Sequence, residues 1–339
     1  MEDDRIREAR AEDGLRAGIA LLGQILTGLC LFVLPYAGSP AWLCVLGAAP
    51  YLFLCRFFSR RAADGGKISL LFAALAAFLD ALAAYVPLSA LCQALLTDLH
   101  PWAAAALPAL FAAGAAGGKE RTLAVLSRPA ALMILLPLLY CVFAALPQIR
   151  IGRLFPLLGK GAGAIGVGAV WIWGCVSCAC LPGARRQTSR QEPRRPLLPL
   201  LAALLLGAGA AALYALLLPY GALIRPASLA DRLTALRRFA SPTWGWPLMT
   251  SALILLLFYA LASALDTAAG MLSDARGRKG SGRLLTALLA LALLPIGAAQ
   301  SRTILRLLIW ILPARAALTM GLWMALCLKK IVKGASSHA

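Results

Sequence analysis

Long apolar runs alternate with short charged or proline- and glycine-rich segments along the whole of this 339-residue chain. Most of the runs reach the length of about 20 residues that an α-helix needs to cross a bilayer. This pattern predicts an all-α polytopic membrane protein with about ten transmembrane helices. The predicted spans are residues 17–37, 40–58, 68–98, 101–117, 122–147, 161–181, 197–219, 246–271, 284–299 and 310–328.

The spans divide the chain into three parts. We expect a cytoplasmic N-terminal segment over 1–16, a single transmembrane domain over 17–328, and a basic cytoplasmic tail over 329–339. Five predicted spans precede the loop before Lys160 and five follow it. This division suggests two inverted halves, repeat one over 17–147 and repeat two over 161–328, as in many transporters.

Glycine and polar residues interrupt the first and sixth spans, which open the two halves. The first span carries Gly23, Gln24, Thr27 and Gly28 at its centre, and the sixth carries Gly174. Backbone groups freed by a break inside a membrane must face protein, a cavity or a ligand, because they meet no water in the lipid. We therefore expect both helices to break at these residues and predict a ligand-binding site there.

The sixth span also contains the sequence G-x-G-x-x-G at Gly161, Gly163 and Gly166. This motif indicates dinucleotide binding only after a buried strand and before a crossover helix, with an acidic residue further along the chain. The surrounding long apolar runs offer neither context. We interpret these glycines as small residues that let membrane helices pack closely, and we expect no cofactor.

Composition and charge agree with a membrane location. Hydrophobic residues make up 61% of the chain and charged residues 14%, with a formal net charge of +19. Lys and Arg gather in alternate loops, which places both termini in the cytoplasm. The charge therefore indicates topology and contact with anionic lipids of the bilayer, and nucleic acid is not an expected partner. Tryptophans lie at the outer span ends, as interfacial anchors should, at positions Trp42, Trp102, Trp244, Trp246 and Trp310.

Two acids within the spans are candidates for ion or proton coupling. Asp80 lies about 18 Å into the third span, near the bilayer centre, and no neighbouring arginine is expected to neutralise it. Asp266 lies near the inner end of the eighth span, where the hydroxyls of Ser263 and Thr267 could share a cation or proton with it. An equally weighted alternative is that Asp266 only pairs with an arginine of the following loop, such as Arg276.

The sixth span ends in a C-x-x-C-x-C sequence, Cys175, Cys178 and Cys180. A thiolate metal site normally has four ligands, and the two histidines lie in an outer loop and in the tail, so we favour a packing role and expect no metal. Trp171 and Trp173 on the same span point to different faces of a helix. One of them could wall a ligand pocket, and a packing role is equally consistent with the sequence.

Three stretches and the tail carry a family resemblance. The stretches are GRLFPLLGKGAGAIGVGAV over 152–170, LHPWAAAALPALFAAGAAGGKERTLAVLSRPA over 99–130 and RPASLADRLTALRRFASPTW over 225–244, and the tail contains LKKIVKG. With ten spans, the chain resembles the B-subunit permeases of bacterial spore-germination receptors, a branch of the amino acid-polyamine-organocation transporter superfamily. The resemblance extends over nearly the whole chain.

The resemblance implies a five-plus-five inverted repeat and a nutrient such as an amino acid held between the broken first and sixth spans. The implied pocket draws on Gly23, Gln24, Thr27 and Gly28 and on Gly174 with its neighbours, which include Trp171, Trp173 and Cys175. Members of the family commonly carry an acid where this chain has Cys175, which argues against proton coupling by the sixth span. Because neither of these two spans has a basic residue at membrane depth, we expect helix N-termini to hold the carboxylate of the ligand.

Two functions remain open. In the first, the protein senses a nutrient germinant and signals to companion germination-receptor subunits in a bacterial cell membrane or spore inner membrane. In the second, it is a proton- or sodium-coupled secondary transporter of amino acids or related solutes. An enzyme is not expected, because no nucleophile with a base, paired catalytic acids or metal set lies at membrane depth.

Overall fold

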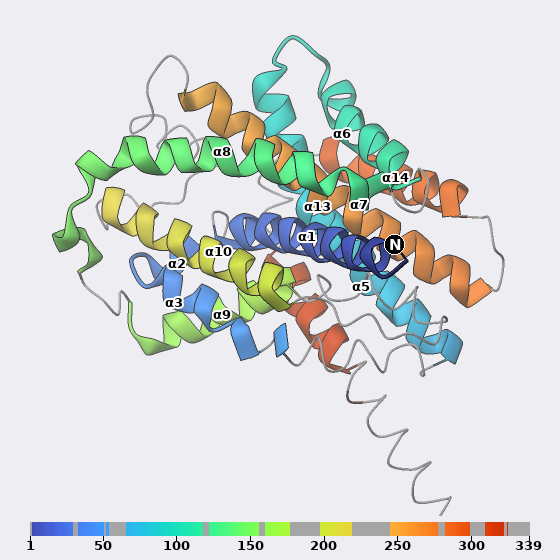
Figure 1. Ribbon diagram of the computed structural model, residues 1–339, viewed down its shortest axis with the longest axis horizontal. Coiled ribbons are helices and arrows are strands. Elements are labelled where there is room, and N and C mark those ends of the chain that lie inside the picture. Colours follow the sequence, from blue (N-terminus) through green and yellow to red (C-terminus); the bar gives the residue numbers. More distant parts are fainter. Residues whose placement is uncertain are drawn as a thin grey trace, which may run out of the picture.

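The computed structural model describes residues 2–29, 33–50, 52–53, 66–117, 122–155, 160–176, 197–218, 245–276, 282–298, 309–321 and 324. Within these ranges every regular element is a helix (Figure 1). The elements are α1 (Glu2–Gly28), α2 (Leu34–Ala37), α3 (Ala41–Leu46), α5 (Gly66–Leu95), α6 (Pro101–Ala116), α7 (Thr122–Val125), α8 (Ser127–Ala145), η3 (Leu146–Gln148), η4 (Ile151–Leu154), α9 (Ala162–Val176), α10 (Leu197–Leu217), α13 (Gly245–Arg276) and α14 (Gly282–Ala298). A further helix covers Ile309–Gly321.

The all-helical, membrane-type fold predicted from the sequence is confirmed. Four helical stretches of the described chain are long and apolar enough to cross a membrane: Leu70–Leu95, Ser127–Gln148, Leu198–Leu217 and Thr250–Arg276. Shorter apolar helices cover Pro101–Ala116, Ala162–Val176, Arg283–Gly297 and Ile309–Gly321. Each of the ten predicted spans contains helix, while the ten-span inverted repeat itself stays a prediction.

The outer surface of the bundle is apolar along α8. Four of its large side chains are 61–66% exposed, namely Leu132, Met133, Leu136 and Phe143. A soluble monomer rarely leaves such a row of side chains in water. Lipid acyl chains are the solvent that suits this surface, in agreement with a membrane-embedded bundle.

The centre of the bundle is built from α5, α13 and α1. The most extensive helix contact of the described chain joins α5 to α13, and α1 packs on α9, α10 and α13 (Figure 1). Small side chains bring these backbones close together, because lipid tails supply no hydrophobic force between helices and association depends on close packing. The buried alanines of α5 and α13 include Ala73, Ala76, Ala77, Ala84, Ala260, Ala262 and Ala268.

The helix breaks lie only in part where the sequence predicted them. The first helix continues through Gly23, and the Thr27 hydroxyl donates a 2.8 Å hydrogen bond to the Gly23 carbonyl. The regular α-helix ends at Gly28, Leu29 and Val33 are π-helical, and α2 begins at Leu34. Helix α9 likewise continues through residue 174 to its end at 176. The break expected at residue 174 was wrong, because Gly174 packs against the Leu312 backbone within a continuous helix. In α1 the backbone is regular at Gly23 and Gln24, and it changes from α-helical to π-helical after Gly28, the last of the residues where a break was expected.

Glycines of α9 differ in what they touch. A Cβ on Gly168 would lie 2.6 Å from the Cys44 sulfur, whereas a Cβ on Gly163 or Gly166 would meet no described atom within 4 Å. Gly161 has a positive φ of 102° just before the helix begins. The described residues therefore give no support for close packing at Gly163 and Gly166, and the close contacts that they show fall on later glycines of the same helix, Gly168 and Gly174.

Candidate ligand and ion-pair site

A buried ion pair joins α5 to the helix Ile309–Gly321. The Arg315 guanidinium contacts the Asp80 carboxylate through Nη2 and Oδ1, and both side chains are completely buried. Asp80 lies at the middle of α5. The prediction that Asp80 has no arginine to neutralise it was wrong, because its partner comes from a helix 235 residues further along the chain.

Arg315 was missed by the sequence analysis although a signal was present. It lies inside the last predicted span, in the apolar run LLIWILPARAALTM, and a charge at that depth is rare in membrane helices and marks function by default. In the structure, the Thr319 hydroxyl donates a 2.9 Å hydrogen bond to the Arg315 carbonyl one turn later. An arginine flanked on both sides by apolar residues should therefore have been a site candidate.

Three helix backbones converge beside this pair. A Cβ on Gly28 of α1 would lie 2.5 Å from the Cys175 sulfur of α9, and a Cβ on Gly174 would collide with the carbonyl of Leu312. Cys175 lies near both Asp80 and Arg315. We call the place where α1, α5, α9 and Ile309–Gly321 meet the four-helix junction. It brings together four predicted site residues, Gly28, Asp80, Gly174 and Cys175, with the unpredicted Arg315.

Two other predicted residues of α1, Gly23 and Gln24, lie about one turn before Gly28. Gly23 faces α13, where a Cβ would lie 3.0 Å from the Leu256 carbonyl. Gln24 is only 5% exposed, and its Oε1 has no hydrogen-bond partner in the described part of the chain. Residues four apart share a helix face, so Gln24 lies on the same side of α1 as Gly28, about 6 Å away along the axis. A buried, unsatisfied amide oxygen therefore faces the same direction as the four-helix junction.

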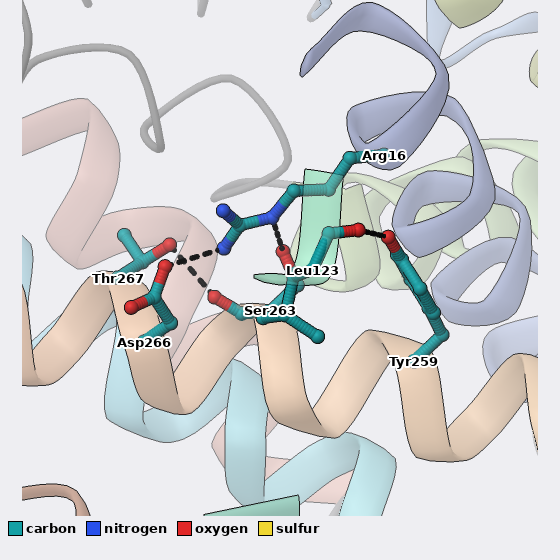
Figure 2. A network of polar contacts seen from close by, with 6 residues as sticks. All are labelled: Arg16, Leu123, Tyr259, Ser263, Asp266 and Thr267. Atoms are coloured by element: carbon teal, nitrogen blue, oxygen red, sulfur yellow. Dashed lines mark hydrogen bonds and ion pairs between the residues drawn. The ribbon is translucent and has the colours of Figure 1, made fainter. Parts of the chain in front are cut away.

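A second polar network links α1 to α13 (Figure 2). Arg16 Nη2 lies 2.7 Å from Asp266 Oδ2, and Arg16 Nε donates a 3.2 Å hydrogen bond to the Ser263 hydroxyl. The Thr267 hydroxyl donates to the Ser263 carbonyl over 2.8 Å. Of the two alternatives for Asp266, the structure shows pairing with an arginine, but the partner is Arg16 of the N-terminal helix and not the exposed Arg276.

The same network continues to α7. The Tyr259 hydroxyl, one turn before Ser263 on α13, donates a hydrogen bond to the Leu123 carbonyl (Figure 2). The Asp266 side chain is 26% exposed and that of Arg16 is 8% exposed. The pair therefore touches solvent or headgroups on one side, unlike the pair at the four-helix junction.

The two candidate tryptophans hold α9 against α2 and the end of α3. Trp171 packs edge-on against Tyr36 at a centroid distance of 5.0 Å, and the Lys160 ammonium lies 5.5 Å from the centroid of the same Tyr36 ring. The Trp173 indole donates a 2.9 Å hydrogen bond to the Gly47 carbonyl. The two side chains have different neighbours, in line with their different helix faces, and a ligand-wall role for either stays a prediction.

Metal chemistry gains no support from the described residues. Among them, no group of three or more His, Cys, Asp or Glu side chains is arranged to hold a metal ion. Cys178 and Cys180 lie outside the described ranges. His100 caps α6, with Nδ1 accepting a 3.4 Å hydrogen bond from the Trp102 amide.

No family model matches this chain, and no curated protein matches it.

Proposed function

We propose that this protein is a nutrient-sensing membrane subunit similar to the B subunits of spore-germination receptors, located in a bacterial cell membrane or spore inner membrane. It binds a small nutrient such as an amino acid at the four-helix junction and passes a conformational change to companion subunits. The Asp80–Arg315 pair is the observation that carries the proposal.

The pair is poorly explained as a stabilising element alone. Removing two charges from water costs several kcal/mol per ion, and well-packed apolar residues of similar volume often stabilise a protein as much or more. Both side chains are completely buried, so this cost applies in full. Intramembrane charges of this kind mark ligand and ion pathways, which supports placing the ligand at the junction.

The surroundings suit a site whose helices move. Contacts through Gly28 and Gly174 hold three helices together with backbone and small side chains, so small shifts there do not require large side chains to repack. The unsatisfied Gln24 oxygen, on the same side of α1, supplies a polar group for a ligand.

A proton- or sodium-coupled secondary transporter is the second candidate, and the Arg16–Asp266 pair favours it. The Asp266 side chain is partly exposed to solvent or headgroups. Among the described residues, Asp266 is the only acid that pairs with Arg16. Protonation of Asp266 would remove the charge that holds Arg16 and would loosen α1 from α13. Such a change could couple a proton to helix movement.

Binding to the purified full-length protein in lipid nanodiscs tests the proposal. We expect at least one member of a panel of the twenty common L-amino acids to raise the unfolding temperature and to bind in equilibrium dialysis. Co-purification with companion membrane subunits then supports the sensor, whereas counterflow uptake by proteoliposomes that contain this chain alone supports the transporter. Absence of binding by every panel member would overturn the proposed amino-acid ligand.

A further inference from the structure

We infer that the ligand is a zwitterion that replaces the internal ion pair, with its ammonium group bound to Asp80 and its carboxylate bound to Arg315. This inference rests on the proposed function and goes beyond it, since it defines the charge type of the ligand and the residue that holds each end. It also replaces the expectation that helix N-termini hold the carboxylate.

Charge balance leads to this ligand class. Asp80 and Arg315 neutralise each other at 0% exposure. A ligand that enters between them must leave each buried charge with a partner, because an unpaired charge in this setting is strongly unfavourable. A zwitterion supplies one charge of each sign and restores both pairs. A simple carboxylate leaves Asp80 either unpaired or forced to take up a proton at a cost in free energy, and a simple amine leaves Arg315 charged and unpaired.

The groups around the pair suit the two ends of a zwitterion. A guanidinium offers parallel N–H donors that match a carboxylate in a bidentate arrangement, which suits Arg315. Gly28 of α1 packs closely against Cys175 beside the pair, since a Cβ on Gly28 would lie 2.5 Å from the Cys175 sulfur. The Gln24 Oε1, without a partner in the described chain, is an acceptor for an ammonium hydrogen.

Exchange of this kind connects binding to movement. In the structure, Asp80 and Arg315 join α5 directly to Ile309–Gly321. A ligand between the two charges converts this direct contact into a bridged one and separates the two helices. Because α5 packs along α13, a displacement of α5 reaches α13, which carries Asp266 of the Arg16–Asp266 pair.

Matched analogues of one amino acid test the inference on the unmodified protein. The tightest-binding amino acid of the panel is compared with its 2-hydroxy acid, which lacks the ammonium group, and with its amide, which lacks the carboxylate. We expect both analogues to bind at least about 100-fold more weakly, because each leaves one buried charge unpaired. A hydroxy acid that binds within a few-fold of the amino acid would overturn the inference and leave the proposed function standing.

Single substitutions should change selectivity in opposite directions. In Asp80→Asn, only the positive charge of Arg315 remains at the site, so the affinity for the hydroxy acid should rise relative to the affinity for the amino acid. In Arg315→Gln, only the negative charge of Asp80 remains at the site, so the affinity for the amide should rise relative to the affinity for the amino acid. Glu12→Gln is the matched control, because Glu12 is a partly buried acid that lies 3.7 Å from Arg128, outside the junction. The ligand selectivity of this variant should equal that of the unmodified protein. Unchanged selectivity in folded Asp80→Asn and Arg315→Gln would also overturn the inference, and the analogue comparison decides the matter if these variants do not fold.

Discussion

Replacing the charges at the four-helix junction one at a time and then together should give strongly non-additive stability changes. In Arg315→Met, the Asp80 carboxylate loses its partner, and in Asp80→Leu the Arg315 guanidinium loses its partner. Breaking a buried pair by removing one member costs about 3–5 kcal/mol. Both side chains are 0% exposed, so water does not screen the charges and the full free-energy cost is expected. The two single variants should therefore be clearly destabilised.

The two single variants should also differ from each other. A buried carboxylate can take up a proton and become neutral, whereas a guanidinium stays charged. Asp80→Leu, which leaves the guanidinium, should therefore be the more destabilised variant. The double variant Asp80→Leu/Arg315→Met has no buried charge at all, and we expect its stability to lie within about 1 kcal/mol of the unmodified protein or above it.

Unfolding in mixed detergent micelles, followed by circular dichroism, measures these differences in a double-mutant cycle. The account predicts a coupling free energy of at least about 3 kcal/mol between the two positions. Additive effects, with the double variant as unstable as the sum of the single variants, would refute the reasoning that the two charges neutralise each other.

Three further predictions use other parts of the molecule. Gly174→Ala should destabilise the protein by about 1–3 kcal/mol, because its Cβ collides with the backbone of the neighbouring helix, whereas Gly163→Ala, with open space around its Cβ, should be neutral or stabilising in the same assay. Asp266→Asn should cost only about 1 kcal/mol, because its carboxylate is 26% exposed, and a loss as large as that of Asp80→Leu would contradict the distinction between the two pairs. In a cysteine-free variant, a single cysteine at residue 188 should react with an impermeant label only from the cytoplasm and one at residue 228 only from outside; the reverse at either position would contradict the predicted topology.

Span positions were predictable because they depend on local composition. Apolar runs of sufficient length become helices in lipid wherever they occur. Each predicted span contains helix, and four of the described helical stretches are long and apolar enough to cross a membrane. The position of Asp80 at the middle of α5 was also predictable, since its depth follows from counting residues along one helix.

Tertiary partners were not predictable in the same way. Asp80 pairs with Arg315 and Asp266 with Arg16, across 235 and 250 residues of chain. Nothing in the local sequence specifies which helix faces lie together, so the nearest arginine in the sequence was a poor guide to the nearest in space. The glycines gave a similar difficulty, because Gly163 and Gly168 look alike in the sequence and only the second touches another helix.

The most direct test of the account is ligand binding by the variant Asp80→Leu/Arg315→Met, in which the buried charges are absent and the fold should persist. Equilibrium dialysis with the tightest-binding amino acid, on protein shown to be monodisperse and as stable as the unmodified chain, gives the answer. The account predicts that this variant loses affinity by at least about 100-fold, while Glu12→Gln binds normally. A folded double variant that binds the amino acid with unchanged affinity would contradict the claim that the Asp80–Arg315 pair is the ligand site.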